Sequence, residues 1–549
     1  MKYLFWLLFL FSMHTFGQNL YLSVKGSTAL ATKKIDSIGY VLKHKDAKAV
    51  VDEARKFEVK LNKLGYLEAK VTLEKKLNDS VLGYEFEMGR RTKFSHLYIG
   101  KKIYDLELSK SDSLVIAFEE TEDFLKNVLS KLEANGFSMA KVKLDNIVLK
   151  NEYLVADLKI ILNKKRALND IVVLGYDKFP EGHLKNLRRM YRNKIFNRQN
   201  LAKVHQDVKQ FRFVKQLKYP EILFTNDSTK IYVYVEKAKN NTFDGFLGFT
   251  NDDKKKLIFT GYIDLVLNNI LNSGEKLMLN WRSNGKEQRT FNAGVEIPYI
   301  FKSPIGMKAN LNIIKQDSTF QTTKTAVDLG YYFNYNTRLY LGYQSSESSD
   351  IKNLNNALIS DFSNDFVTSN FEYVNYKNDS FLFPEKTFCS VKVGTGKRTS
   401  KFQENSQIFG SLTVKHDLYL NSKNSINLKS ENFYLQSTDY ILNELHRFGG
   451  INSLRGFNEN SLQGNFYSSI LTEYRYVVSS NLYVHTIFDY GYYQDKTINK
   501  TDKLLGLGFG FGLLTKNGLF NLVYANGSSQ GQEIKFSNSI VHISLKASF

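Results

Sequence analysis

The chain has 549 residues, which is too long for one ordinary domain, and its formal net charge is +20. This charge comes mainly from dispersed lysines, without an arginine-rich helix or a zinc or RNA-binding motif, so we expect no nucleic-acid partner. A single cysteine, Cys389, excludes intramolecular disulfides and multi-cysteine metal sites, while five prolines against 33 tyrosines and 41 phenylalanines favour long strands.

The first 17 residues have the pattern of a secretory signal peptide. Lys2 supplies a positive start, residues 4–11 are apolar, and Thr15 and Gly17 are the small residues that precede a cleavage site. No later run of about 18 apolar residues is available for a transmembrane helix. The pattern therefore leaves a secreted soluble protein or a β-barrel.

Residues 18–240 repeat one plan three times, with a strand, a helical segment and closing strands in each unit. The units span residues 18–90, 91–165 and 166–240. The predicted helices are 47–64 and 121–135 in the first two units, and a basic helical stretch at 181–217 in the third.

Glycines mark the ends of the first two helices. Gly65 and Gly136 stand at the position after the helix, where a left-handed backbone is needed. The aromatic residue after each glycine, Tyr66 or Phe137, is predicted to open a strand. This repeated plan resembles the POTRA modules of the BamA/TamA superfamily, and the resemblance implies α+β modules located in the periplasm.

From Asn241 onward the helical period disappears. Val327, Leu329 and Tyr331 alternate with polar or small residues, and glycines occupy every second position of residues 506–512. Such alternation over about ten residues, repeated between turns, is typical of transmembrane β-barrels. We therefore predict an all-β transmembrane barrel of sixteen antiparallel strands over residues 241–549.

The last predicted strand, residues 539–549, places apolar side chains on one face and ends the chain on Phe549. This strand resembles the C-terminal signal of outer-membrane barrels. A strand of a soluble β-sandwich could alternate in the same way, but it need not end the chain on phenylalanine.

Strand spacing predicts the orientation of the barrel. Strands are expected at 466–476, 482–492, 504–515, 519–525 and 539–549, joined by alternating short and long connections. Because the short turns of such barrels face the periplasm, the C-terminus and the three modules are expected on that side. The first strand is predicted to be short, at 243–249, which would leave few ladder bonds at the seam with the last strand.

The long connection before Phe466 contains a motif, GGINSLRGF, that resembles the Arg-Gly-Phe loop of the BamA/TamA superfamily. Its motif residues are Gly449, Gly450, Leu454, Arg455, Gly456 and Phe457. Its position, five strands before the C-terminus, matches the sixteen-stranded plan of that superfamily. The resemblance implies that the loop folds into the barrel lumen.

The resemblance also implies acidic partners for Arg455 on the next two strands, and the matching residues are Glu473 and Asp489. Both occupy lumen-facing positions. The superfamily pattern has phenylalanine two residues before the aspartate, whereas this chain has Ile487. Asp489 is expected two to four residues from the rung of Glu473, so Arg455 is predicted to reach only one of them well. The alternative is an exposed arginine beside incidental acids.

Other motifs indicate no chemistry. Residues 394–399, GTGKRT, lack the upstream glycine of a phosphate-binding loop. The glycines at 506–512 are predicted to keep one wall smooth for the Arg455 loop. The histidines lack the spacing of metal ligands. We therefore expect no enzyme activity, no metal and no cofactor.

The resemblance implies an outer-membrane factor that docks unfolded outer-membrane proteins on its modules and inserts them through the barrel. Periplasmic or inner-membrane accessory subunits and outer-membrane lipid are its further expected partners. Three modules before the barrel are closer to the layout of TamA than to that of BamA. The alternatives are a two-partner secretion translocase and, less favoured, a porin or receptor, which would explain neither the modules nor the loop.

Overall fold

The computed structural model describes residues 19–100, 111–251, 257–284, 288–353, 358–377, 380, 382–516, 518–530 and 539–549. The predicted signal peptide at 1–17 lies outside these residues. The described chain forms two compact units, one that ends at Arg166 but also holds residues 195–199, and one of residues 167–194 and 200–549. No described helix has the length and apolar character needed to cross a membrane.

The first unit contains two four-stranded sheets, with strand orders β2-β1-β4-β3 and β6-β5-β8-β7. The strands are β1 (Leu20–Gly26), β2 (Lys43–His44), β3 (Lys70–Asn78), β4 (Val81–Glu87), β5 (Phe94–Tyr98), β6 (Ser113–Ala117), β7 (Lys141–Lys150) and β8 (Tyr153–Ile161). Helices α2 (Ala29–Ile38) and α3 (Ala47–Lys63) accompany the first sheet, and α4 (Thr121–Ala134) accompanies the second. The α3 helix turns Val50, Phe57 and Leu61 into the core, as its apolar spacing requires.

Gly65 and Gly136 follow α3 and α4 with φ values of +93° and +95°, so the predicted helix ends are confirmed. The prediction for the next residues was wrong, because Tyr66 and Phe137 do not open strands. Each lies in a turn in which its carbonyl accepts from the amide three residues later, and the strands begin only at Lys70 and Lys141. Tyr66 is instead buried in the module core.

The second unit begins with a third module around the central strand β12 (Thr229–Lys237). Its other elements are β9 (Asp170–Leu174), α5 (Glu181–Tyr191), α6 (Arg198–Gln210), β10 (Val214–Gln216) and β11 (Glu221–Phe224). β9 pairs with β12 in parallel, whereas β10 and β11 pair with it antiparallel. The stretch predicted to be helical at 181–217 therefore ends in a strand.

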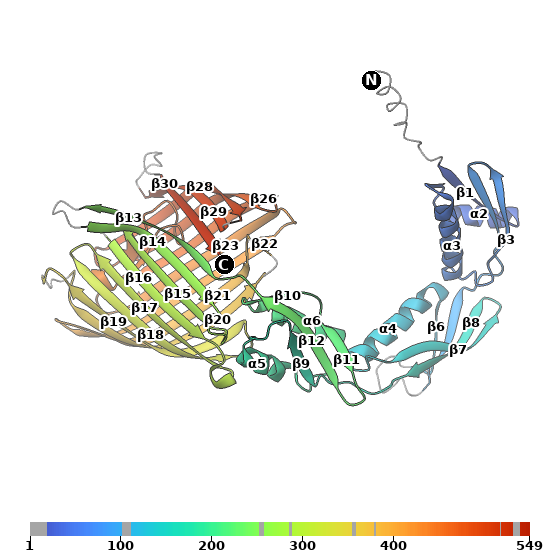
Figure 1. Cartoon of the computed structure of the whole chain (residues 1–549), viewed down its shortest axis with the longest axis horizontal. Helices are drawn as coiled ribbons and strands as arrows, with labels where there is room; N and C mark the ends of the chain where they lie inside the picture. Colours follow the sequence, from blue (N-terminus) through green and yellow to red (C-terminus); the bar gives the residue numbers. More distant parts are fainter. Residues whose placement is uncertain are drawn as a thin grey trace, which may run out of the picture. The chain divides into compact units, whose positions relative to one another are not determined.

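A closed antiparallel barrel of sixteen strands follows, which confirms the predicted fold class (Figure 1). The strands are β13 (Thr242–Asn251), β14 (Leu257–Asn268), β15 (Lys276–Asn284), β16 (Gln288–Ile297), β17 (Ile305–Gln316), β18 (Phe320–Tyr332), β19 (Thr337–Asp350), β20 (Phe362–Tyr376), β21 (Glu385–Ser400), β22 (Glu404–Tyr419), β23 (Asn424–Gln436), β26 (Phe466–Ser479), β27 (Leu482–Asp495), β28 (Lys500–Thr515), β29 (Gly518–Ser529) and β30 (Ile540–Ser548). The side chains that point outward, such as Leu341, Val367 and Phe509, are apolar and exposed. This is the pattern of a lipid-facing surface.

The third module contacts the short connections of the barrel. Asn186 of α5 donates to the carbonyl of Ser303 (3.0 Å), and the Gln210 side chain accepts from the Tyr376 amide (2.7 Å). His183 is fully buried here, with aromatic rings on several sides, among them Phe213 and Tyr299. Burial lowers the pKa of His183 to about 3, because a charged ring would lose its hydration, and the nearby charge of Arg338 acts in the same direction.

The barrel closes through a sparsely paired seam between β13 and β30. Among the described residues, their register partners are Thr242 with Ser548 and Phe243 with Ala547, and the Phe549 amide adds a hydrogen bond to the Asn241 carbonyl. On its other side, β13 pairs with β14 from Thr242 to Asn251. The first strand is therefore longer than the predicted 243–249, and the weakness lies in its pairing with β30.

Candidate functional site

The candidate site is the long connection between β23 and β26, the eleventh and twelfth strands of the barrel. Two short strands, β24 (His446–Phe448) and β25 (Leu462–Gly464), pair to form its stem. The tip between them carries the motif residues. Gly449, Gly450 and Gly456 have φ values between +87° and +108°, a backbone region that side-chain-bearing residues rarely adopt, so the glycines permit the folded tip.

The tip is buried against the inner wall of the barrel. Leu454 has no exposed surface and packs with Phe448, Tyr467 and Leu504, while Phe457 lies at the edge of the same cluster. Arg455 is only 5% exposed. The alternative interpretation, in which Arg455 is an exposed loop residue that lies beside acidic residues by chance, is therefore wrong.

Arg455 contacts both carboxylates named from the sequence. Its Nε and Nη2 donate to the two oxygens of Asp489 at 2.7 and 2.5 Å, and its Nη1 donates to Glu473. The Arg455 amide also donates to Asp489 (3.1 Å). The expectation that Arg455 reaches only one carboxylate well was wrong. A guanidinium has donors on both edges, and Asp489, paired with Leu471, lies only two residues from the rung of Glu473.

A second arginine extends this network and was missed by the sequence analysis. Arg475 donates to Glu473 (2.7 Å) and to Asp417 (3.0 Å), and Asn427 donates to the same Asp417 oxygen (2.6 Å). Glu473 thus lies between two guanidiniums. Arg475 stands two residues after Glu473, on the same strand face, and this spacing is the one signal that the sequence offered.

Glycines on the wall make room for the tip. A Cβ at Gly506 would lie 2.4 Å from the Arg455 carbonyl oxygen, and one at Gly527 would lie 2.3 Å from the Gly456 carbonyl oxygen. The smooth wall predicted for residues 506–512 is thus present at Gly506. Further along β28 the prediction was wrong, because Gly510 and Gly512 lie against the rings of His485 and Tyr483 rather than against the loop.

A separate anchor holds the base of the loop. Arg398, which has no exposed surface, donates to Asp439 (2.7 Å) and to Glu444 (2.5 Å), and Gln407 donates to the other Glu444 oxygen (2.9 Å). Arg398 belongs to the GTGKRT segment, in which the sequence analysis found no function. Only the strand register, which turns Arg398 inward, reveals its role.

The remaining predicted residue, Phe549, is 55% exposed at the end of β30, on the face that carries Val541, Ile543 and Leu545. Among the residues that the structure describes, no cluster of histidine, cysteine and carboxylate side chains could hold a metal ion. The arrangement at Arg455 is a set of buried ion pairs that positions a loop.

Comparison with known proteins gives the fold alone. No family model and no curated protein matches the sequence. Among solved structures, CdiB from Acinetobacter baumannii has a TM-score of 0.51 at 14% identity, and CdiB from Escherichia coli has 0.51 at 12%; each match covers 91% of this chain and 98% of the other. BamA from Haemophilus ducreyi lacking POTRA domains 1–3 matches with a TM-score of 0.46 at 15% identity, covering 82% and 98%.

The chain has the fold of the two CdiB proteins. The resemblance inferred from the sequence is confirmed at this level.

Proposed function

We propose that the protein is a non-enzymatic assembly factor of the outer membrane, with its modules in the periplasm. It docks unfolded outer-membrane proteins on the modules and inserts them into the membrane through the seam between β13 and β30. The observation that carries this proposal is the sparse pairing at that seam, with two register pairs in an otherwise continuous barrel.

Side chains bridge part of the seam where the backbone ladder stops. The Leu545 amide donates to the Asp244 carboxylate (3.3 Å), and the Tyr262 hydroxyl donates to Asp244 (2.8 Å) and lies 3.4 Å from the Ile543 carbonyl oxygen. A client strand has backbone donors and acceptors that can replace these contacts. Incompletely paired strand edges are templates for such pairing.

The modules offer further strand edges. β3 and β7 each lie at the edge of a sheet, and exposed apolar side chains accompany them, such as Leu73 on β3 and Ile147 on β7. Unfolded client segments can add to such edges as extra strands. Accessory subunits and outer-membrane lipid remain proposed partners.

The buried loop favours insertion over passage through the lumen. Ion pairs at Arg455 and Arg398 hold the loop against the wall at its tip and its base. A lumen route requires these pairs to break, whereas a lateral route through the seam leaves them in place. We therefore propose that clients leave sideways into the membrane.

The test locks the seam with a disulfide. Cysteines replace the register partners Thr242 and Ser548 in a Cys389→Ser background, and the variant is expressed in native cells depleted of the wild-type protein. Oxidation is expected to reduce newly inserted outer-membrane proteins to the level of the depleted cells, and reduction restores them. An inventory of outer-membrane proteins by mass spectrometry measures this effect.

The control pair is Thr325 and Ser345, register partners on β18 and β19, where a disulfide joins strands that are already fully paired. Oxidation of this pair is expected to change nothing. Normal client insertion by the fully cross-linked seam would refute the proposal. Continued release of a client into the medium through the locked barrel would instead establish a secretion translocase.

A further inference from the structure

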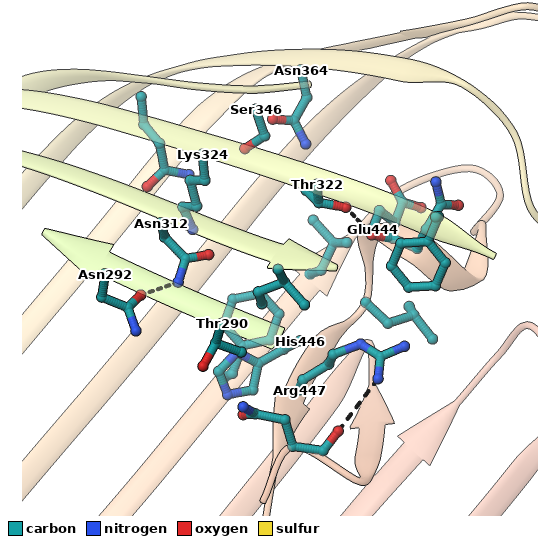
Figure 2. A pocket seen from close by; sticks show the side chains of 18 of the residues that line it. Thr290, Asn292, Asn312, Thr322, Lys324, Ser346, Asn364, Glu444, His446 and Arg447 are labelled. Atoms are coloured by element: carbon teal, nitrogen blue, oxygen red, sulfur yellow. Dashed lines mark hydrogen bonds between the residues drawn. The ribbon is translucent and has the colours of Figure 1, made fainter. Parts of the chain in front are cut away.

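A cavity of about 500 Å³ lies inside the barrel, apart from the Arg455 ion pairs. Its walls are the inner faces of β15 to β20, with Phe409 and Phe433 from β22 and β23, and residues 443–447 at the base of the loop. Figure 2 shows its lining, in which Lys324 and Asn312 come from neighbouring strands and His446 and Arg447 come from the loop. A cavity of this size accommodates a small organic ligand.

One rung of polar residues runs through the cavity. Following register partners from β15 to β22, the rung consists of Asn280, Asn292, Asn312, Lys324, Ser346, Asn364, Arg398 and Asn405. Hydrogen bonds link its first three amides, from Asn312 to Asn292 and from Asn292 to Asn280. The six members from Asn280 to Asn364 line the cavity, so six neighbouring strands present polar groups to it.

The charges of the cavity do not cancel. Arg282 is paired with Glu459 at 3.0 Å, and Arg398 is paired with both Glu444 and Asp439, so these five groups carry one net negative charge. Lys324 and Arg447 form no ion pair with any described residue; Arg447 donates to Gln316 (3.1 Å) and to the Asn460 carbonyl (3.3 Å), which are both neutral. Cations enclosed by protein normally face an anion. The cavity therefore has an excess of positive charge that favours an anionic ligand.

Two buried acceptors add a second requirement. The side-chain oxygens of Asn364 and Asn443 have no hydrogen-bond partner among the described residues, although both side chains line the cavity. A ligand with hydroxyl donors satisfies such acceptors. The stacked rings of His446 and Phe433, 4.5 Å apart, together with Phe320, add flat apolar surface.

We propose that this cavity binds an acidic carbohydrate, a polyhydroxylated ring that carries a carboxylate or another oxyanion. The anion faces Lys324 and Arg447, and the hydroxyl groups donate to Asn364 and Asn443. The ring lies against the aromatic surface. This inference does not depend on the gating of the seam.

The test uses the full-length protein in detergent micelles and isothermal titration calorimetry. Digalacturonate is the probe, and galactobiose, its uncharged counterpart, and inorganic phosphate are the comparison ligands. Digalacturonate is expected to bind saturably, and its affinity is expected to fall as salt is added. Lys324→Gln and Arg447→Gln are each expected to weaken binding about tenfold, the loss of one charge-assisted contact. Lys423→Gln, an exposed lysine of the short β22–β23 turn, is the control and leaves binding unchanged.

Heat-modifiable migration on gels shows whether each variant barrel is folded, and the salt dependence of the wild-type protein tests the charge argument without a variant. The proposal is overturned if digalacturonate fails to bind, if salt leaves its affinity unchanged, or if a folded Lys324→Gln protein binds as the wild type does. If galactobiose binds with equal affinity, the negative charge of the ligand does not contribute to binding. If phosphate binds with equal affinity, the sugar does not contribute to binding.

Discussion

At Arg455, one side chain joins two strands and the loop tip, because its donors reach a carboxylate on β26 and another on β27. Asp489 has no exposed surface, so its charge depends on this partner. At Gly506, the absence of a side chain matters equally, since the backbone of Arg455 occupies the space of a Cβ. Both residues act by positioning the loop.

Arg455→Ala is expected to leave a closed barrel with a displaced loop and to abolish complementation of a deletion. Removing one partner of a buried ion pair costs about 3–5 kcal/mol, although water in the lumen lowers this value. Protease cleavage within residues 449–461 should increase. Arg289→Ala, at an exposed barrel arginine, is the control. Full complementation by Arg455→Ala would show that the loop position is irrelevant to function.

Gly506→Ala is expected to push the loop tip from the wall and to destabilise the protein by about 1–3 kcal/mol, the usual cost of overpacking. Gly410→Ala is a matched control, because a Cβ at Gly410 has no neighbour within 4 Å. Thermal unfolding and complementation measure both effects. Equal stability and equal complementation of the two variants would mean that the wall accommodates a Cβ at Gly506 without loss of stability.

At the scale of elements, α5 and the final strand join parts that lie far apart in the chain. Through α5, His183 is placed against Gly274, a turn residue at which a Cβ would lie 1.9 Å from the imidazole. Through β30, the barrel meets its own first strand. Each junction depends on a few residues and can be perturbed separately.

Docking of the third module is expected to weaken in acid. The pKa of His183 is about 3 when docked and near 6.5 when released, so the released form binds the extra proton below pH 6.5. Docking free energy is constant above pH 6.5 and falls by about 1.4 kcal/mol per pH unit from there down to pH 3. Between pH 6.5 and 5 this amounts to about 2 kcal/mol.

The helical unfolding midpoint, followed by circular dichroism at pH 7.5 and pH 5, measures this effect. His183→Phe keeps an aromatic ring at the position and should reduce the shift between the two pH values. An unchanged shift in this variant would exclude His183 as its source.

Deleting Phe549 is expected to reduce insertion of the protein itself more than its stability after insertion, because the exposed terminal ring contributes little to packing. The deletion also removes the hydrogen bond from the Phe549 amide to Asn241, which Phe549→Ala retains. If the ring is the signal, both variants insert poorly. Phe301→Ala, at a ring that is 95% exposed in a short turn, is the control. Normal insertion of both Phe549 variants would exclude the signal.

At the scale of the molecule, local patterns predicted the elements but not their lateral partners. Two-residue alternation revealed the strands, glycines after α3 and α4 revealed the helix ends, and the motif located Arg455. The rung through Lys324 and Arg398 could not be predicted, because it depends on the stagger of eight strands, which no single segment contains. The Arg475–Asp417 pair was missed for the same reason, since Asp417 stands 58 residues away in the chain.

The seam has a further consequence for amide hydrogen exchange. In a uniformly closed ring every strand is protected on both sides, whereas this barrel resembles a strip whose two ends barely join. Amides of β30 that point toward β13 should exchange with deuterium far faster than those that point toward β29, with which β30 pairs from Ile540 to Lys546. Mass spectrometry of the protein in lipid nanodiscs would resolve this asymmetry within one strand. Uniform protection of β30 would mean that the seam is as firmly closed as the rest of the wall.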